Sequence, residues 1–428
     1  MTRTGIRILW VMIAVGTAAR VAVAFATYGL GFDIHSLATV GAELTRDNPL
    51  QVYDSVNQGG SGIEGERLYR WPYAPGFFPW IAFSIAVEHR SPLPFHGLVQ
   101  LPAILSDVAI ALIVQAYLGW RGAGERVRLA AAGAVALGPI FALISGFHGQ
   151  IDSVAILPAV VALIVFEGRG RELLESIPWA PARRLADWMD ERGSPGEPRA
   201  GLTGALIGLG IAVKTVPAIL LVALIPLARR LSEVGRMVAI AALIPLVAIL
   251  PFLIADPDGV IRVADYRGAP GIGGLNLVIQ PELALAWLNR QDALDLSTAS
   301  QLLFDWGHYL LAAILLALAF LIRRQQLEPV DAAVLVWVAV YTFGPTYFNQ
   351  YLIWGMPFFL MAGYVRQTIA LQLVVIGPAI LLYMYPWPVS SEVEYIYVPA
   401  LLIVWAAFFV SFVLLVRRAF KRPAEATA

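Results

Sequence analysis

Long apolar stretches separated by short polar links recur along almost the whole chain. Many are close to the ~20 residues that a helix needs to cross the ~30 Å hydrocarbon core of a bilayer. They predict spanning helices at 7–28, 99–119, 129–146, 150–166, 201–213, 215–228, 237–254, 306–322, 330–346, 350–365, 367–385 and 397–416. We therefore expect an all-α polytopic membrane protein with about twelve transmembrane helices, folded as a single integral-membrane domain over residues 1–428.

One further apolar stretch, 71–87, is expected to lie on the membrane surface as a re-entrant or interfacial helix. Pro72, Pro75 and Pro79 make it a poor spanning helix, because proline lacks an amide hydrogen and disrupts helix interiors. With this stretch outside the bilayer core, the short arginine-rich links all fall on one side of the membrane. The positive-inside rule makes that side cytoplasmic, so both termini are expected in the cytoplasm.

Two long segments are then expected on the outer side of the membrane. The first extracytoplasmic loop covers 29–98 and carries interfacial helices, and the second covers 255–305. All five histidines lie on the outer side by this assignment. Polar chemistry is therefore expected at the extracytoplasmic face.

Composition agrees with a membrane protein and excludes several other classes. Apolar residues make up 59% of the chain and charged residues 14%, whereas soluble domains carry roughly 25% charged residues. The 30 basic and 30 acidic residues cancel, which gives no general charge for binding nucleic acid. The chain has no cysteine, so disulfides and thiolate chemistry are excluded. Its positive charge is almost all arginine, which favours a bacterial source and thus the bacterial inner membrane.

Ionisable residues within the apolar stretches are costly and are candidates for function. Arg20 is expected either to pair with a carboxylate or lipid phosphate, or to extend to the interface. Asp107 needs a neutralising partner, for which Arg20 is the candidate. Lys214 stands where one apolar stretch turns into the next, so it is placed either to bind a phosphate as a point charge or to reach the interface.

Two polar groups lie beside outer helix ends. Asp33 follows the first apolar stretch among apolar neighbours, where a partly desolvated carboxylate can act as a general base, although a surface-turn aspartate is the alternative. His148, Gln150 and Asp152 occupy the short link between two predicted helices and can direct donors and a carboxylate into a water-filled cavity. A helix cap by Asp152 would explain only part of this group.

A later group, Asn349, Gln350 and Tyr351, lies at another outer helix end. Tyrosine belongs equally well to the aromatic belt of a membrane protein, but the two amides add hydrogen bonding that a belt does not need. Gly204 and Gly208 form a small-xxx-small pair, which predicts close helix packing.

The order of these groups resembles the polyprenyl-phosphate-sugar-dependent glycosyltransferases of the C superfamily (GT-C). The matching strings, in chain order, are Phe32-Asp33-Ile34-His35, Trp71-Pro72-Tyr73-Ala74-Pro75-Gly76, Leu101 to Asp107, His148-Gly149-Gln150-Ile151-Asp152, Val213-Lys214-Thr215-Val216-Pro217 and Asn349 to Trp354. The resemblance is best over 1–230, which it identifies as a catalytic module containing the outer loop 29–98. Residues 231–428, with outer loop 255–305, correspond to the variable C-terminal helices of that family.

The resemblance implies a role for each candidate. Asp33 corresponds to the acidic residue of the first outer loop that serves as catalytic base. The donor phosphate would be bound by Lys214, His148 and Arg20. The remaining candidates would bind substrate: His35, Gln150, Asp152, Tyr73, Asn349, Gln350 and Tyr351.

The implied reaction is an inverting transfer of a single sugar, mannose or another hexose. The donor is a polyprenyl-phosphate sugar and the acceptor a lipid-linked sugar or glycolipid, with the active site facing the periplasm. Neither a metal nor another cofactor is expected, and the only other partners are membrane lipids.

Two alternatives from other classes share the expected topology. A twelve-helix secondary transporter would carry internal repeats and polar groups near the membrane midplane, and the sequence shows neither. A lipid-linked glycan flippase or ligase would use outer cationic residues but leaves Asp33 without a role.

Overall fold

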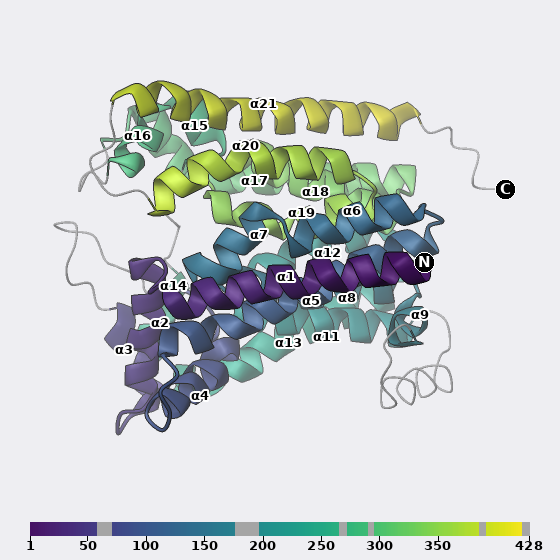
Figure 1. Ribbon diagram of the computed structural model, residues 1–428. Coiled ribbons are helices and arrows are strands. Elements are labelled where there is room, and N and C mark those ends of the chain that lie inside the picture. The colour runs from purple at the N-terminus through teal and green to yellow at the C-terminus, as the bar shows by residue number, and fades with distance from the viewer. Residues whose placement is uncertain (58–70, 176–196, 265–271, 290–294, 385–390, 422–428) are drawn as a thin grey trace. The chain divides into compact units, whose positions relative to one another are not determined.

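The computed structural model describes residues 1–57, 71–175, 197–264, 272–289, 295–384 and 391–421 (Figure 1). Over these residues the chain is built from helices, and the only β pairing is an isolated bridge between Gly273 and Tyr347. The chain divides into two compact units. Unit 1 contains the described residues within 1–221 and 228–266, and unit 2 those within 222–227 and 267–428.

Among the described residues, 7 helical stretches are long and apolar enough to cross a membrane. They are α1 (Arg3–Ala26), α5 (Phe95–Trp120), the continuous stretch of α6 (Glu125–Ala136), α7 (Pro139–Leu143) and η3 (Ile144–His148), α13 (Leu231–Ala255), α17 (Thr298–Gln325), α20 (Val365–Met384) and α21 (Ser391–Lys421). Shorter apolar helices are α8 (Asp152–Phe166), α11 (Glu197–Val213), η4 (Val216–Ile219) with α12 (Leu220–Leu224) and η5 (Ile225–Leu227), and α18 (Pro329–Phe343). The protein is thus a multi-pass membrane protein, but the predicted count of about twelve spans is not confirmed.

The predicted span at 350–365 is not a single helix. The chain forms η6 (Asn349–Trp354) and then the short α19 (Met356–Met361), with Gly355 between them. Pro357 has no amide hydrogen, and the Gly355 amide donates to the Tyr341 hydroxyl at 2.8 Å as well as to the Leu352 carbonyl at the end of η6. The prediction of a single spanning helix here was wrong, because apolarity alone does not distinguish a broken segment from a spanning helix.

The predicted non-spanning stretch 71–87 folds as η2 (Pro75–Phe77) followed by α4 (Phe78–Glu88). The 11 residues of α4 extend only ~16 Å at 1.5 Å per residue, about half of a ~30 Å hydrocarbon core. The proline-rich start therefore has the predicted consequence that this stretch does not span.

The other helices of the two predicted outer loops are also short. Loop 29–98 contains α2 (Gly31–Leu44), η1 (Pro49–Gln51) and α3 (Val52–Asn57) besides η2 and α4, and loop 255–305 contains α14 (Pro257–Ala264), α15 (Leu275–Ile279) and α16 (Glu282–Leu288). Residues 58–70, 265–271 and 290–294 of these loops lie outside the described residues. Another short helix, α9 (Gly170–Glu175), follows α8.

Within unit 1 the apolar helices α1, α5, α8, α11 and α13 run side by side, and α2, α3, α4 and α14 gather at one end of them (Figure 1). A buried aromatic cluster lies under these short helices. The Tyr53 ring packs against Phe78 and Phe252 at centroid distances of 5.8 and 5.5 Å, and Trp71 packs against Phe78 at 5.4 Å. Phe252 comes from α13, so the cluster fastens the short helices to the end of a long one.

Unit 2 is organised around the buried helix α18. The Tyr341 hydroxyl on this helix donates to the Tyr351 carbonyl at 2.9 Å and accepts from the Gly355 amide at 2.8 Å. Trp405 of α21 donates through its indole nitrogen to the Thr342 carbonyl at 3.0 Å. These bonds occupy backbone groups that a broken helix would otherwise leave unpaired in an apolar environment.

Glycines allow α11 and α13 to pack in close contact, as the small-xxx-small pair predicted. A Cβ on Gly204 would lie 2.4 Å from the Met237 carbonyl oxygen, and one on Gly208 would lie 3.0 Å from the Ala241 oxygen. Because these neighbours are backbone atoms of the facing helix, they cannot move aside as a flexible side chain would.

We expect Gly204→Ala to destabilise the protein, because the helices must separate to admit the methyl group, at a cost of about 1–3 kcal/mol. The measurement is the thermal unfolding midpoint of the detergent-solubilised protein. Gly235→Ala on α13 is the matched control, since nothing lies within 4 Å of a Cβ there. Equal midpoints for the two variants would contradict this packing.

Candidate functional site

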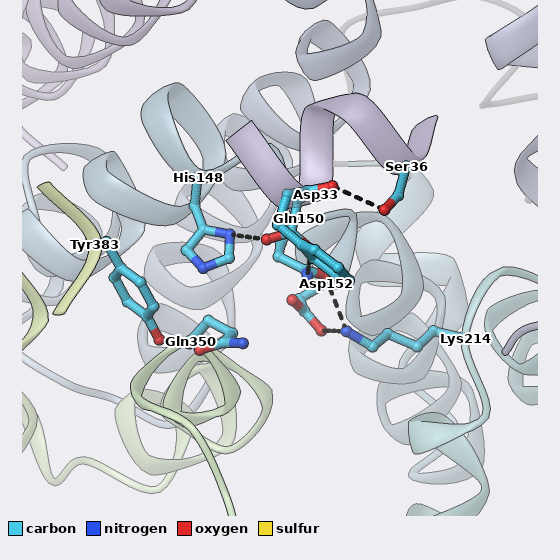
Figure 2. A network of polar contacts seen from close by, with 9 residues as sticks. Asp33, Ser36, His148, Gln150, Asp152, Lys214, Gln350 and Tyr383 are labelled. Atoms are coloured by element: carbon cyan, nitrogen blue, oxygen red, sulfur yellow. Dashed lines mark hydrogen bonds and ion pairs between the residues drawn. The ribbon is translucent and has the colours of Figure 1, made fainter. Parts of the chain in front are cut away.

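Three segments of unit 1 bring polar side chains together: the first turn of α2, the link between η3 and α8, and the residue after α11 (Figure 2). Asp33 comes from α2, His148 and Gln150 from the link, and Lys214 from the end of α11. The backbone fixes α2 against the link, since the Leu30 amide donates to the Phe147 carbonyl at 3.2 Å.

Two glycines that the sequence reasoning did not single out permit this close approach. Gly29 has a φ of 72°, and a Cβ there would lie 2.2 Å from the Phe147 carbonyl oxygen. Gly149 has a φ of 85°, and its Cβ would lie 2.4 Å from a side-chain carbon of Ile34. Only glycine adopts such angles without a steric cost. Each glycine is close in sequence to a candidate site residue, Gly29 to Asp33 and Gly149 to His148, and this proximity was the signal from which the close approach could have been predicted.

Gln150 connects the acidic and the basic side of the site. Its Nε2 donates to Asp33 Oδ1 at 2.6 Å, and its Oε1 accepts from Lys214 Nζ at 3.1 Å. One amide therefore contacts both charged residues.

Lys214 and Asp152 form a buried ion pair, with Nζ 2.6 Å from Oδ1 and side chains that are 3% and 0% exposed. The Lys214 ammonium also lies 5.1 Å from the centre of the Tyr73 ring, a cation–π contact. Asp152, at the start of α8, thus neutralises Lys214. The alternative prediction, that Asp152 only caps a helix, does not account for this ion pair.

The second oxygen of Asp33 faces a histidine. Asp33 Oδ2 lies 3.2 Å from His148 Nδ1, and the His148 side chain is buried. His148 ends the π-helical turn η3, an irregularity that often re-aims a side chain at functional sites. Both carboxylate oxygens of Asp33 thus have a nitrogen neighbour.

These surroundings raise the pKa of Asp33 from 3.8 to about 7. Burial is the main cause, and the negative charge of Asp152 adds to it; the charge of Lys214 and the hydrogen bond from Gln150 act in the opposite direction. The Asp33 side chain keeps 17% of its surface exposed. A carboxylate with a pKa near neutrality and residual access suits a general base.

Arg20 and Asp107 belong to a separate buried group. Arg20 donates to the Ala136 carbonyl at 2.5 Å and to the Val135 carbonyl at 2.7 Å, and its Nε lies 3.5 Å from Asp107 Oδ2. Ser153 donates to Asp107 Oδ1 at 2.5 Å. The predicted pairing of Arg20 with Asp107 is confirmed. These contacts join α1 to α5, α6 and α8, which is a structural role.

The remaining predicted substrate-binding residues take different positions. His35 is exposed on α2, two residues from Asp33 and hence on another face of the helix, while Tyr73 is half-buried against Lys214. Asn349, Gln350 and Tyr351 belong to unit 2, where Gln350 accepts from the Tyr383 hydroxyl and Tyr351 stacks on Trp354 at 4.1 Å. Substrate binding by these residues stays a prediction.

Residues 79–262 match the family model of glycosyltransferase family 87. The matched segment includes the link that carries His148 and Gln150 as well as Lys214, whereas Asp33 and Tyr73 precede it. The glycosyltransferase resemblance that the motif order indicated is confirmed at this level.

Two solved glycosyltransferase structures are distantly similar to the chain. ArnT from Cupriavidus metallidurans in the apo state is 15% identical, with a TM-score of 0.43 over 96% of this chain and 72% of that one. The archaeal oligosaccharyltransferase AglB from Archaeoglobus fulgidus, in complex with an inhibitory peptide and a dolichol-phosphate, is 13% identical, with a TM-score of 0.38 over 96% and 56%. At these scores the likenesses add nothing to the family match. A comparison with proteins of curated function gives no match.

We expect Arg20→Met to lower the stability of the protein, not to affect donor binding selectively. It would leave the buried Asp107 carboxylate without its cation, which costs about 3–5 kcal/mol. Thermal unfolding of Arg20→Met, of Arg20→Met/Asp107→Asn and of the exposed control Arg3→Met measures this effect. The double variant should recover part of the loss. A fully stable Arg20→Met with weakened donor binding would contradict the structural role.

Proposed function

We propose that this protein transfers a single sugar, mannose or another hexose, from a polyprenyl-phosphate donor to a lipid-linked or glycolipid acceptor, with inversion. Asp33 is the general base of this reaction. The observation that supports the proposal is the Asp33 carboxylate itself, which is partly desolvated, hydrogen-bonded by Gln150 at 2.6 Å and raised in pKa to about 7.

The chemistry requires one proton acceptor and one leaving group. As the acceptor hydroxyl attacks the anomeric carbon, its proton passes to Asp33, while the bond from that carbon to the phosphate oxygen breaks and the phosphate leaves with the electron pair. Attack opposite the leaving group gives inversion. A phosphate leaves without a general acid, so no second proton-transfer residue is required, and no metal is part of the proposal.

Lipid substrates fit the exposed apolar helices of unit 1. In the most apolar windows of α1 and α13, only 28% and 11% of the residues are buried. Apolar surface of this kind faces lipid in a membrane protein. A polyprenyl chain could therefore remain in the bilayer while its phosphate and sugar reach the Asp33 end of the bundle. By the predicted topology that end faces the periplasm of a bacterial inner membrane.

The donor phosphate requires positive charge or hydrogen-bond donors. The sequence suggested Lys214, His148 and Arg20, and of these Arg20 has the structural role described above. Each of them has other contacts in the structure: Lys214 with Asp152 and Gln150, His148 with Asp33, and Arg20 with Asp107. A phosphate at Lys214 would have to share that ammonium with Asp152.

We expect Asp33→Asn to reduce sugar transfer by roughly 10²–10⁴-fold, the usual contribution of a general base. The assay follows radiolabel from polyprenyl-phosphate mannose, and from other polyprenyl-phosphate hexoses, into lipid acceptors. Asp47→Asn, on an exposed aspartate of the same predicted loop, is the matched control and should keep wild-type activity. Undiminished transfer by Asp33→Asn would remove the assignment, and translocation of the donor lipid without transfer would support a flippase.

The pH profile gives a separate test. Because the base must be ionised and the pKa of Asp33 is about 7, kcat/KM should rise with pH through about 7 and then level off. The measurement is initial transfer rate from pH 5 to 9 at low donor concentration. A rate that stays constant from pH 5 to 9 would contradict this prediction, because an ordinary aspartate, with a pKa near 4, is already ionised over that range.

A further inference from the structure

Four side chains form an unbroken polar series across unit 1: Asp152, Lys214, Gln150 and Asp33 (Figure 2). The successive contacts are 2.6, 3.1 and 2.6 Å long. The residues come from α8, from the end of α11, from the link before α8 and from α2. Charges alternate along the series, with the neutral amide of Gln150 between the ammonium and the Asp33 carboxylate.

The orientation of the Gln150 amide is fixed by its two neighbours. A glutamine amide has one end that only donates and one that only accepts. With the observed orientation the NH₂ group meets a carboxylate and the carbonyl oxygen meets an ammonium. Reversing the amide would place oxygen against oxygen at Asp33 and NH₂ against the ammonium at Lys214, so both contacts would become repulsive. Lys214 therefore stabilises the orientation of Gln150 in which the NH₂ group faces Asp33.

The Lys214 ammonium is engaged on the protein side of the site. It donates to Asp152 and to Gln150, and the Tyr73 ring lies 5.1 Å away. Its side chain is 3% exposed and its partner Asp152 is 0% exposed. A lysine that serves mainly as a phosphate ligand needs an accessible ammonium, whereas the Lys214 side chain is buried and its ammonium already has two hydrogen-bond acceptors.

We propose that Lys214 is a positioning residue: through the Gln150 amide it holds the Asp33 carboxylate in the orientation in which it accepts the proton of the acceptor hydroxyl. Asp152 in turn fixes Lys214. The inference rests on the proposed role of Asp33 as base and replaces the phosphate-binding role expected for Lys214.

Gln150→Glu is the most informative substitution. It preserves side-chain shape and an acceptor for Lys214, but it removes the NH₂ donor and places a negative charge beside Asp33. The groups that face Asp33 from other elements, His148, Lys214 and Asp152, all remain. We expect kcat at pH 7 to fall ~10–100-fold, as for small misplacements of reacting groups. The acid limb of the pH profile should move to higher pH, with donor KM nearly unchanged.

The Lys214 end is tested by Lys214→Met/Asp152→Asn, which removes the ion pair without leaving a buried charge. This double variant should reproduce the fall in kcat and the displaced acid limb with donor KM nearly unchanged, and adding Gln150→Leu should cost little more. Gln115→Leu is the matched control, because the Gln115 amide also accepts from a cation, Arg128 at 2.9 Å, away from this series. Thermal unfolding identifies any variant whose loss reflects misfolding.

The outcomes separate this inference from the proposed function. A raised donor KM with kcat retained in the Lys214 variant would make Lys214 a phosphate ligand and overturn the inference. Independent, multiplicative losses from the Gln150 and Lys214 changes would also overturn it, as would wild-type kcat and pH profile in Gln150→Glu. An active Asp33→Asn, measured in parallel, would instead remove the base on which both proposals rest.

Discussion

The buried ion pair between Lys214 and Asp152 is the interaction on which the arrangement of the candidate site depends. Two opposite charges taken out of water are tolerated only together, because either one alone would carry the full cost of desolvation. The pair therefore ties the end of α11 to the start of α8 at 2.6 Å. Through Gln150 the same ammonium reaches α2, so three segments take their relative positions from one cation.

The burial of Asp33 in this arrangement lowers the stability of the folded protein at neutral pH. The pKa of Asp33 is raised from 3.8 to about 7, so the folded state holds the carboxyl proton more tightly than the unfolded state does. The contribution of Asp33 to the free energy of unfolding consequently decreases as pH rises from about 4 through 7, where the unfolded chain is already ionised. Packing of the aromatic cluster around Tyr53 and Phe252 holds the surrounding helices together despite this cost. Reactivity at Asp33 and stability of unit 1 are thus opposed.

Charges within apolar helices do not all serve the reaction. Arg20 satisfies two carbonyl oxygens and Asp107, and it joins α1 to α5 and α6. From the sequence alone, Lys214 was a candidate for binding phosphate and Arg20 was a reserve candidate for the same task. The contacts of Arg20 hold helices together, whereas those of Lys214 lead through Gln150 to Asp33. This distinction depends on which carbonyls and carboxylates surround each cation.

The sequence by itself determined the helical membrane class, the short helix after the prolines that begin at Pro72, the close packing at Gly204 and the set of polar residues at helix ends. These are local properties, since apolar runs, prolines and glycine spacing act within a few residues. Only the tertiary structure showed that the apolar run at 350–365 is broken, that Asp152 neutralises Lys214 and that Gln150 connects Lys214 to Asp33. Those contacts join residues 62, 64 and 117 positions apart. Whether such distant groups meet depends on how the helices pack, which no local pattern of residues encodes.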